Sequence, residues 1–459
     1  MILEILSKFR LSIFVIAYLL LNINAFAVDD DVKKMITEAS GISDNDAVTA
    51  SQKKAVTLFD VYALAVKNTE RLAIEGESSI QSEAKRQQAY GAFLPKVYLR
   101  ANKYFAEKYK LGSSSQRDTI ALYARQPIMT GLEEFSAFKA SLSDIKIKKY
   151  NLNNNILQLL LDVSSSFYNV IQIEKSIKTG EEIINLYKRT LNELNRRAAI
   201  GRSRKSEVQR TITELYKLEA ERKTLQNNLT RAKLALKTIT GAKDDLKLTE
   251  GAEIPDPDYK IEGLKTLTER RWDIKTALET VEQAKARVLS AYGGNLPSIY
   301  ADATYLLYYE KNSTSSGGNS RDYYFSMGAE LPIFNGGITF AKIKEARSIK
   351  RQSELDLSRT IRFAEEDIID SFQNWVSSKN EYEAFKKALD SAEENYKMVN
   401  NEYRLNLVTI LDLITSLKSL QTAKDDYERS MLQHKLNRIK LAVAATELSG
   451  KNIGILKTE

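Results

Sequence analysis

The chain has little proline and no cysteine: its 459 residues contain six prolines. At an average usage of ~5 %, about 20 prolines would be expected. An interior proline removes a backbone hydrogen bond and clashes with the preceding turn, so long proline-free stretches suit long uninterrupted helices. The absence of cysteine excludes disulfides, thiolate metal sites and cysteine nucleophiles. It also excludes a lipoprotein signal, because that lipid is attached to a cysteine.

Histidine is nearly absent too, since His434 is the single one in the sequence. A histidine-based triad or a multi-histidine metal site is therefore excluded within one chain, and we expect no catalytic residues, no metal and no cofactor. The net charge is +8, but 68 Lys and Arg are spread among 60 Asp and Glu. Without a binding motif beside the charge, we expect no nucleic-acid partner.

The N-terminus has the three parts of a secretory signal peptide. Lys8 and Arg10 form a positive region, residues 11–21 are an apolar run, and Ala25-Phe26-Ala27 is a small-residue cleavage site. The pattern predicts export with a mature chain from Val28. The run is shorter than the ~20 residues of a spanning helix; an uncleaved anchor is the alternative.

Four of the prolines mark an internal repeat. Residues 94–98 (LPKVY) recur as 296–300 (LPSIY), and residues 126–131 (QPIMTG) recur as 331–336 (LPIFNG). Ser-rich, Gly-containing stretches at 112–118 and 312–322 indicate turns between them. Each half is therefore predicted to contain a helix, two strands, a long helix and a second long helix. Pro255 and Pro257 lie in the linker between the halves.

Between the paired prolines the hydrophobic period is two. Tyr323, Phe325 and Met327 alternate with the polar or small Ser326 and Gly328, which predicts strands with one apolar and one polar face. Aromatic residues near strand ends are typical of a membrane girdle; the candidates are Tyr104, Tyr123, Tyr305, Tyr323 and Phe325. Two ordinary hairpins of a soluble sheet would show the same alternation, and both interpretations stay open here.

After each second proline the period becomes helical. Apolar residues step by four and three along a heptad seam: Ile156, Leu160, Val163, Phe167 and Val170, and in the second half Leu413, Leu417 and Leu420, continuing with polar interruptions through Lys424, Tyr427, Met431 and His434. Such helices of ~100 Å must bury their seams against each other and against other chains. Four strands do not close a barrel and open edges are not tolerated in lipid. Closure therefore needs two chains or three, and a wide lumen favours three.

The ordered motifs resemble the TolC family of outer-membrane channel proteins. Residues 57–68 (TLFDVYALAVKN) are similar to its opening helix, the two Leu-Pro pairs to its strand starts, and residues 331–337 (LPIFNGG) to its strand exit. The duplicated order of these motifs is the family's hallmark. The resemblance covers nearly the whole mature chain.

The resemblance implies a mainly α fold with a membrane β-barrel. A homotrimer would close twelve strands, four per chain, above a long periplasmic α-helical coiled-coil barrel. The implied function is an exit duct in the outer membrane of a Gram-negative bacterium, for small-molecule efflux or type I protein secretion. Its partners would be a periplasmic adaptor, an inner-membrane ABC or proton-driven transporter, and outer-membrane lipid. The predicted segments are signal peptide 1–27, N-terminal segment 28–56, first repeat 57–250 with strand pair 94–130 and hairpin 131–240, equatorial linker 251–264, second repeat 265–450 with strand pair 296–334 and hairpin 337–448, and tail 451–459.

The helix-to-helix turns would form the periplasmic tip. Glu207 and Asp412 fit the acidic position of the family's tip motif, and Asp412 matches the first of two gate acids. The second gate position is Thr415, a departure from the family. Three copies of Asp412 around a constriction would repel one another and attract cations. The alternative is a helix-capping or solvated acid near Thr409.

The same turns resemble adaptor-docking sites. They are residues 200–202 (Ile200, Gly201, Arg202) and 405–407 (Leu405, Asn406, Leu407), in which Arg202 and Asn406 depart from the family pattern. The basic residues around Arg202 would dock an acidic adaptor tip, pair with Glu207 and Asp412 to hold the tip closed, or only be solvated. A periplasmic adaptor, a passive porin and an exported hydrolase are competing classes. The two hairpins disfavour an adaptor, which would carry one. The helices of ~100 Å disfavour a porin, and the missing nucleophile–base set disfavours a hydrolase.

Overall fold

The computed structural model of the chain describes residues 28–53, 55–103, 119–242, 246–251, 255–256, 267–309 and 323–448. The predicted signal peptide, Tyr104, the two loops between strands, most of the linker and the tail lie outside the described residues. The chain divides into two compact units. We call Met1–Glu77, Leu152–Trp272 and Phe363–Glu459 the hairpin unit, and Ser78–Asn151 and Asp273–Arg362 the strand unit.

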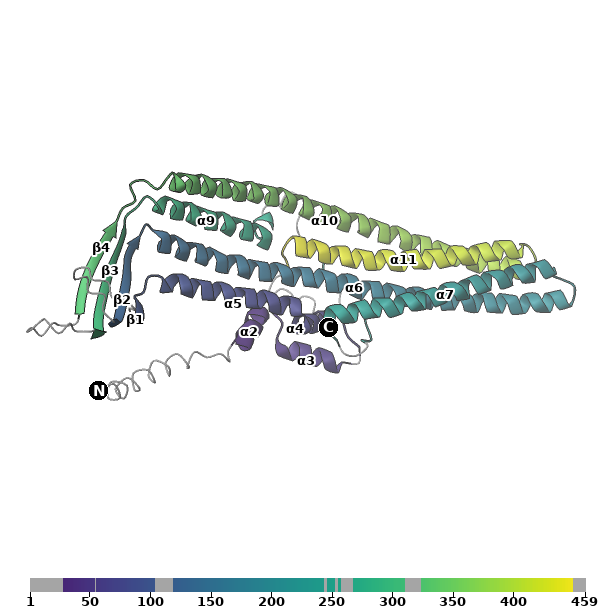
Figure 1. Ribbon diagram of the computed structural model, residues 1–459. Helices are drawn as coiled ribbons and strands as arrows, with labels where there is room; N and C mark the ends of the chain where they lie inside the picture. The colour runs from purple at the N-terminus through teal and green to yellow at the C-terminus, as the bar shows by residue number, and fades with distance from the viewer. Residues whose placement is uncertain are drawn as a thin grey trace, which may run out of the picture. The chain divides into compact units, whose positions relative to one another are not determined.

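The elements occur in an order that repeats along the chain (Figure 1). The sequence helix, two strands, long helix, second long helix occurs twice, which confirms the predicted mainly α fold with four strands and a two-fold repeat. The trimer and the barrel stay predictions. In chain order the elements are α2 (Val28–Ser40), α3 (Asp44–Gln52), α4 (Leu58–Asn68), α5 (Glu70–Gly91), β1 (Lys96–Asn102), β2 (Thr119–Thr130), α6 (Glu133–Ala199), α7 (Lys205–Thr240), α9 (Trp272–Gly293), β3 (Ser298–Tyr309), β4 (Tyr323–Glu330), α10 (Ile338–Arg404) and α11 (Ile410–Ala444).

The two longest helices, α6 and α10, have 67 residues each. At 1.5 Å per residue each measures ~100 Å. Gly180 lies inside α6 without ending it, because neighbouring helices compensate for the weak helix propensity of one glycine. Among the described residues, α6 also holds one stretch that is apolar and long enough to cross a membrane by length and composition, but half of that stretch is buried in the structure, as in a core helix.

The hairpin unit buries the predicted heptad seam of α6. Ile156, Leu160, Val163, Phe167 and Val170 are each at most 1 % exposed and pack with residues of α4 and of the ends of α7 and α11. A second cluster nearer the tip joins α6, α7, α10 and α11.

The seam of α11 differs from the prediction in its second half. Leu413, Leu417 and Leu420 are buried, as expected, but further along the fully buried residues include Leu432 and Ile439, which the prediction did not name. Tyr427 and Met431 are only partly buried. Met431 still packs against the core, and Tyr427 stacks on Tyr382 of α10 with ring centres 5.7 Å apart, so the predicted residues lie at the edge of the buried seam beyond Leu420. The apolar pattern is ambiguous there because Asp425, Asp426 and Glu428 interrupt it.

Ion pairs of Glu250, the residue before the inter-repeat linker, and a hydrogen bond to the linker tie this part of the chain to the helices of the hairpin unit. Glu250 contacts the amines of Lys175 on α6 (2.6 Å) and Lys435 on α11 (2.8 Å). Arg438 of α11 donates from Nε to the carbonyl of Pro255 at 2.8 Å. Glu250 thus joins α6 to α11 at the end of the hairpins away from the turns.

The strand unit contains one antiparallel sheet with the order β1-β2-β3-β4. The four strands lie side by side in Figure 1. β2 and β3 join the two repeats, and a register shift follows Pro127 because proline has no N–H for the ladder. β1 and β4 are the edges, so each has one row of backbone groups that no described strand pairs.

Candidate functional site: strand faces and helical tip

The sheet has an apolar face and a polar face, as the alternation predicts. Residues directly opposite in the ladder share a face, and one row runs Leu99, Leu122, Tyr305, Tyr323 across the four strands. These side chains are 42–60 % exposed, and Phe325 of the next row is 71 % exposed. A soluble sheet hides its apolar face against a core. This sheet exposes it, which favours the membrane interpretation over a soluble hairpin pair.

The polar face carries a cluster of charged and aromatic side chains. Arg125 of β2 donates from Nε and Nη2 to the two carboxylate oxygens of Asp302 on β3, at 2.7 and 2.9 Å. The guanidinium carbon lies 4.7 Å from the ring centre of Tyr300 and 5.6 Å from that of Tyr123. This fork links the two repeats inside the sheet.

Tyr123 therefore does not lie with the other predicted girdle residues. It belongs to the row Tyr98, Tyr123, Thr304, Tyr324 of the polar face, whereas Tyr305, Tyr323 and Phe325 belong to the apolar face. An aromatic residue that faces away from the apolar surface does not fit a lipid girdle. Tyr104 lies outside the described residues.

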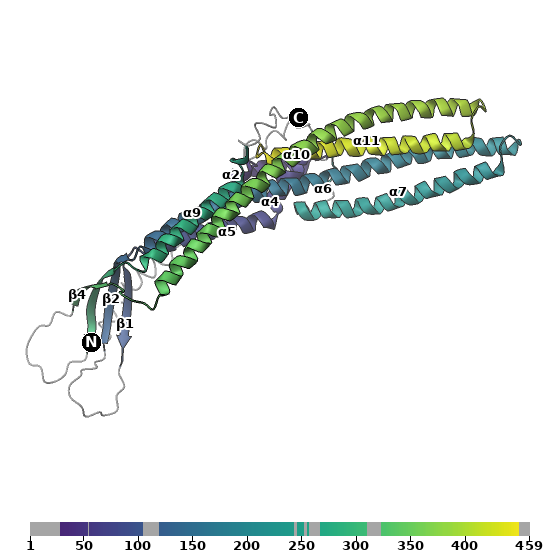
Figure 2. The same cartoon turned by 90° about the horizontal axis from the view of Figure 1, so that it is seen from above.

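The two tip turns have the same backbone structure and contact each other within the hairpin unit (Figure 2). Gly201 and Asn406 both have a left-handed conformation, with φ of 73° and 61°. In each turn the next residue donates its N–H back across the helix end, from Arg202 to Arg197 O at 2.8 Å and from Leu407 to Glu402 O at 2.9 Å. This is a Schellman ending, in which glycine or asparagine is the favoured left-handed residue.

The acidic residues of the tip motif cap the helices that follow the turns. Asp412 Oδ2 accepts from the backbone N–H of Thr409 at 2.8 Å and from its hydroxyl at 2.6 Å. Glu207 Oε2 accepts from the backbone N–H of Arg204 at 3.2 Å. The shared motif thus has a local structural role in both repeats. The hydrogen bonds from Thr409 lower the pKa of Asp412, so its carboxylate stays charged at neutral pH.

Asp412 and Thr415 lie on one exposed face of α11, one turn apart. The hydroxyl of Thr415 donates to Leu411 O of its own helix at 2.8 Å. Leu411 on the same face is 50 % exposed. Sequence reasoning missed this residue, although an apolar side chain directly before Asp412 was visible as a signal.

Arg197 joins the two turns. It donates to Asn406 Oδ1 at 2.8 Å and to Glu193 at 2.7 Å, and its guanidinium lies 4.9 Å from the ring centre of Tyr403. These contacts do not include the predicted pairing of the basic tip residues with Glu207 or Asp412. Within the described part of the chain, the side chains of Arg196, Arg202, Arg204 and Lys205 form no ion pair.

Apolar side chains project from both turns. Ile200 is 66 % exposed, Leu405 69 % and Leu407 71 %. Beside them, Arg202 and Arg204 are exposed cations. The predicted docking residues therefore form two adjacent exposed turns with apolar and basic side chains. His434 lies elsewhere in the hairpin unit: its ring stacks between those of Trp375 and Tyr382, with centroids at 6.3 and 6.0 Å, as expected for a packing residue.

A sheet with an exposed apolar face, combined in one chain with tandem long helical hairpins, defines a class: the outer-membrane export channels. A family model described as "Outer membrane efflux protein" matches residues 79–242 and 263–446, one stretch in each repeat. The outer membrane protein TolC of Escherichia coli (strain K12) is 21 % identical over 441 residues, which are 92 % of this chain and 88 % of that protein.

Solved structures share the fold. CusC matches with a TM-score of 0.77 and 16 % identity, covering 84 % of this chain and 91 % of that one. VceC of Vibrio cholerae matches with a TM-score of 0.73 and 17 % identity, covering 84 % and 95 %.

The chain belongs to the outer membrane efflux protein family. It is accordingly an outer-membrane channel protein that serves as an exit duct for efflux, and it is not an enzyme.

Proposed function

We propose that three copies of the chain form the duct, with the four strands of each copy contributing to one closed barrel in the outer membrane. The open edges β1 and β4 and the exposed apolar face support this proposal. Strand edges are not tolerated in lipid, and the antiparallel order lets β4 of one copy pair with β1 of the next. The polar face with Arg125 and Asp302 then lines the water-filled lumen. Tyr305, Tyr323 and Phe325 face the lipid.

The exposed apolar face is the observation that carries the proposal. Fractionation of cells should recover the protein with the outer membrane, and unboiled gels should show an oligomer that dissociates on heating. Purified protein should open ion-conducting pores in planar bilayers. Recovery as a soluble monomer would contradict the proposal.

We further propose that the tip is a gate in which Asp412, Thr415 and Glu207 surround the constriction. Asp412 then has two roles, because the same carboxylate that caps α11 also carries a charge at the exposed face. Asp412→Asn keeps an oxygen acceptor for Thr409 but removes the charge, whereas Asp412→Ala removes both. A gate role predicts weaker block by divalent cations in both variants. If only the alanine variant differed from wild type, the residue would be a cap alone.

We propose that the two turns dock a periplasmic adaptor whose tip is apolar and acidic. Exposed Ile200, Leu405 and Leu407 offer apolar contacts around the left-handed Gly201 and Asn406, and Arg202 supplies charge. An inner-membrane ABC or proton-driven transporter supplies the energy, and the cargo is small molecules, secreted proteins or both. Leu407→Ser and Arg202→Glu should each reduce adaptor cross-linking in cells. Lys344→Glu on α10, an exposed charge outside the turns, is the control; equal cross-linking in all three would exclude docking at the turns.

A further inference from the structure

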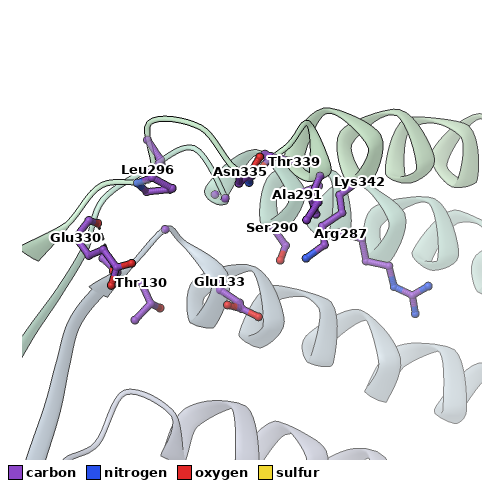
Figure 3. A pocket seen from close by; sticks show the side chains of 16 residues that line it. Thr130, Glu133, Arg287, Ser290, Ala291, Leu296, Glu330, Asn335, Thr339 and Lys342 are labelled. Carbon is purple, nitrogen blue, oxygen red and sulfur yellow. Dashed lines mark hydrogen bonds between the residues drawn. The ribbon is translucent and has the colours of Figure 1, made fainter.

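A cavity of about 500 Å³ lies in the strand unit, where the strands meet the helices (Figure 3). Its walls come from both repeats: the corner between β2 and α6, the last turns of α9, the ends of β3 and β4, and the first turns of α10. The volume is within the usual range for a small-molecule site. Neither the gate nor the docking turns use it.

Backbone packing forms the cavity. Gly131 and Gly293 approach so closely that a Cβ on Gly293 would lie 2.7 Å from the carbonyl carbon of Gly131, and closer still to its oxygen. Across the cavity, Asn335 donates to the hydroxyl of Thr339 at the start of α10. The hydroxyl oxygen of Thr130, also in the wall, is buried and has no hydrogen-bond partner in the structure. A buried polar atom without a partner is one that a ligand would satisfy.

Charged groups of both signs surround the cavity. In Figure 3 the amine of Lys342 and the guanidinium of Arg287 lie on the side formed by α9 and α10, whereas Glu330 lies beside Thr130 at the strand ends. Glu133 lies on the first turn of α6. Among the described residues, Glu133, Glu330 and Lys342 have no ion-pair partner, and Arg287 donates to Gln283 of its own helix at 3.2 Å. These charges do not neutralise one another, so both ends can accept charges from a ligand.

The cavity opens on the polar face of the sheet. Ser298 and Glu330, which are ladder partners and line the cavity, continue the face that carries Asp302 and Ser326. This step rests on the proposed function, in which this face lines the lumen. Cargo in the duct can then reach the cavity.

We propose that this cavity is a transient binding site for zwitterionic small molecules. The anionic group of the ligand contacts Arg287 and Lys342, its ammonium group contacts Glu330 and Glu133, and a hydroxyl or carbonyl group reaches Thr130. Exposed charges give weak binding, which suits a duct because cargo must also leave. Each charge removed is expected to weaken binding about threefold, the size of one exposed ion pair.

Ampicillin and benzylpenicillin are a matched pair of probes, since both carry a carboxylate but only ampicillin carries an amine. In planar bilayers, ampicillin added on the extracellular side should interrupt the current for about three times longer than benzylpenicillin. The double variant Glu330→Gln/Glu133→Gln should remove that difference, because no carboxylate is then left for the amine, and Lys342→Gln should shorten both dwell times. Lys344→Gln and Glu345→Gln, exposed charges of α10 outside the cavity, are the controls.

Equal dwell times for the two probes in wild-type pores would overturn the cavity proposal and leave the duct proposal standing. Saturation-transfer NMR on the purified protein in detergent tests the cavity without a pore. If saturation transfer is stronger to ampicillin than to benzylpenicillin, and the difference is lost in the double variant Glu330→Gln/Glu133→Gln, the result supports the cavity even if no current is measured. Absence of current by itself would contradict the duct. Heat-modifiable migration on gels shows that each variant has folded.

Discussion

Replacement of glycine by alanine is expected to have opposite effects on stability at Gly293 and at Gly180. Gly293 lies against the backbone of Gly131, whereas Gly180 has free space around it. In Gly293→Ala the new Cβ would lie 2.7 Å from the carbonyl carbon of Gly131. Neither group can rotate away, because the neighbour is backbone. In Gly180→Ala, in the middle of α6, the Cβ would meet no atom within 4 Å.

The expected magnitudes follow from packing and from helix propensity. Forcing an extra methyl group into a closed contact costs ~1–3 kcal/mol of stability. Alanine gains up to ~1 kcal/mol over glycine inside a helix, and less at the last residue of α9. We therefore expect Gly293→Ala to lower the free energy of unfolding by about 2 kcal/mol and Gly180→Ala to raise it by ~0.5–1 kcal/mol.

Purified protein in detergent, heated in steps and run on unboiled gels, gives the midpoint temperature of oligomer loss. Gly293→Ala should lower this midpoint, and Gly180→Ala should leave it unchanged or raise it. A Gly293→Ala protein as stable as wild type would refute the reasoning, because the backbone contact between α9 and the corner of β2 and α6 could then widen without loss of stability.

Two further predictions concern the hairpin unit. Burial raises the pKa of Asp425 on α11 to about 6, with Glu221 and Asp426 adding to the rise and Arg429 opposing it, and Oδ1 has no hydrogen-bond partner. Because the folded pKa is above the ordinary value, the unfolded chain loses its proton first, and stability falls as pH rises from about 4 to about 6. Asp425→Asn should therefore raise the free energy of unfolding at pH 7 by about 1 kcal/mol after allowance for partial solvation, and with it the heat-dissociation midpoint, and should change little at pH 4. A variant less stable than wild type at pH 7 would contradict this, and Asp370→Asn, at an exposed carboxylate of α10, is the control. Arg197→Ala removes the contacts with Asn406 and Tyr403 and should increase pore conductance, whereas Arg196→Ala should not; equal conductance of the two variants would show that Arg197 does not restrain the tip.

The repeat and the strand pairs could be predicted because local rules determine them. The prolines mark where the strands begin and end, and the alternation from Tyr323 onward gives the two faces of β4 directly. The capping position of Asp412 was also readable, since Thr409 precedes it by three residues.

Contacts between distant residues could not be read from the sequence. Arg197 and Asn406 are separated by 209 residues, and no local pattern distinguishes Arg197 from Arg196. The cavity depends on two glycines from different repeats whose backbones meet. Beyond Leu420 of α11 the sequence did not show which residues are fully buried, because charged residues interrupt the apolar pattern there.

The central claim is that copies of the chain join edge to edge, β4 to β1, in the outer membrane. Because the sequence contains no cysteine, Leu99→Cys in β1 and Phe325→Cys in β4 together give two unique reactive sites per chain. Treatment of cells with a flexible bis-maleimide, followed by a denaturing gel, should give bands of one, two and three chains and none larger. A single band of one chain, or a series that ends at two, would contradict the account.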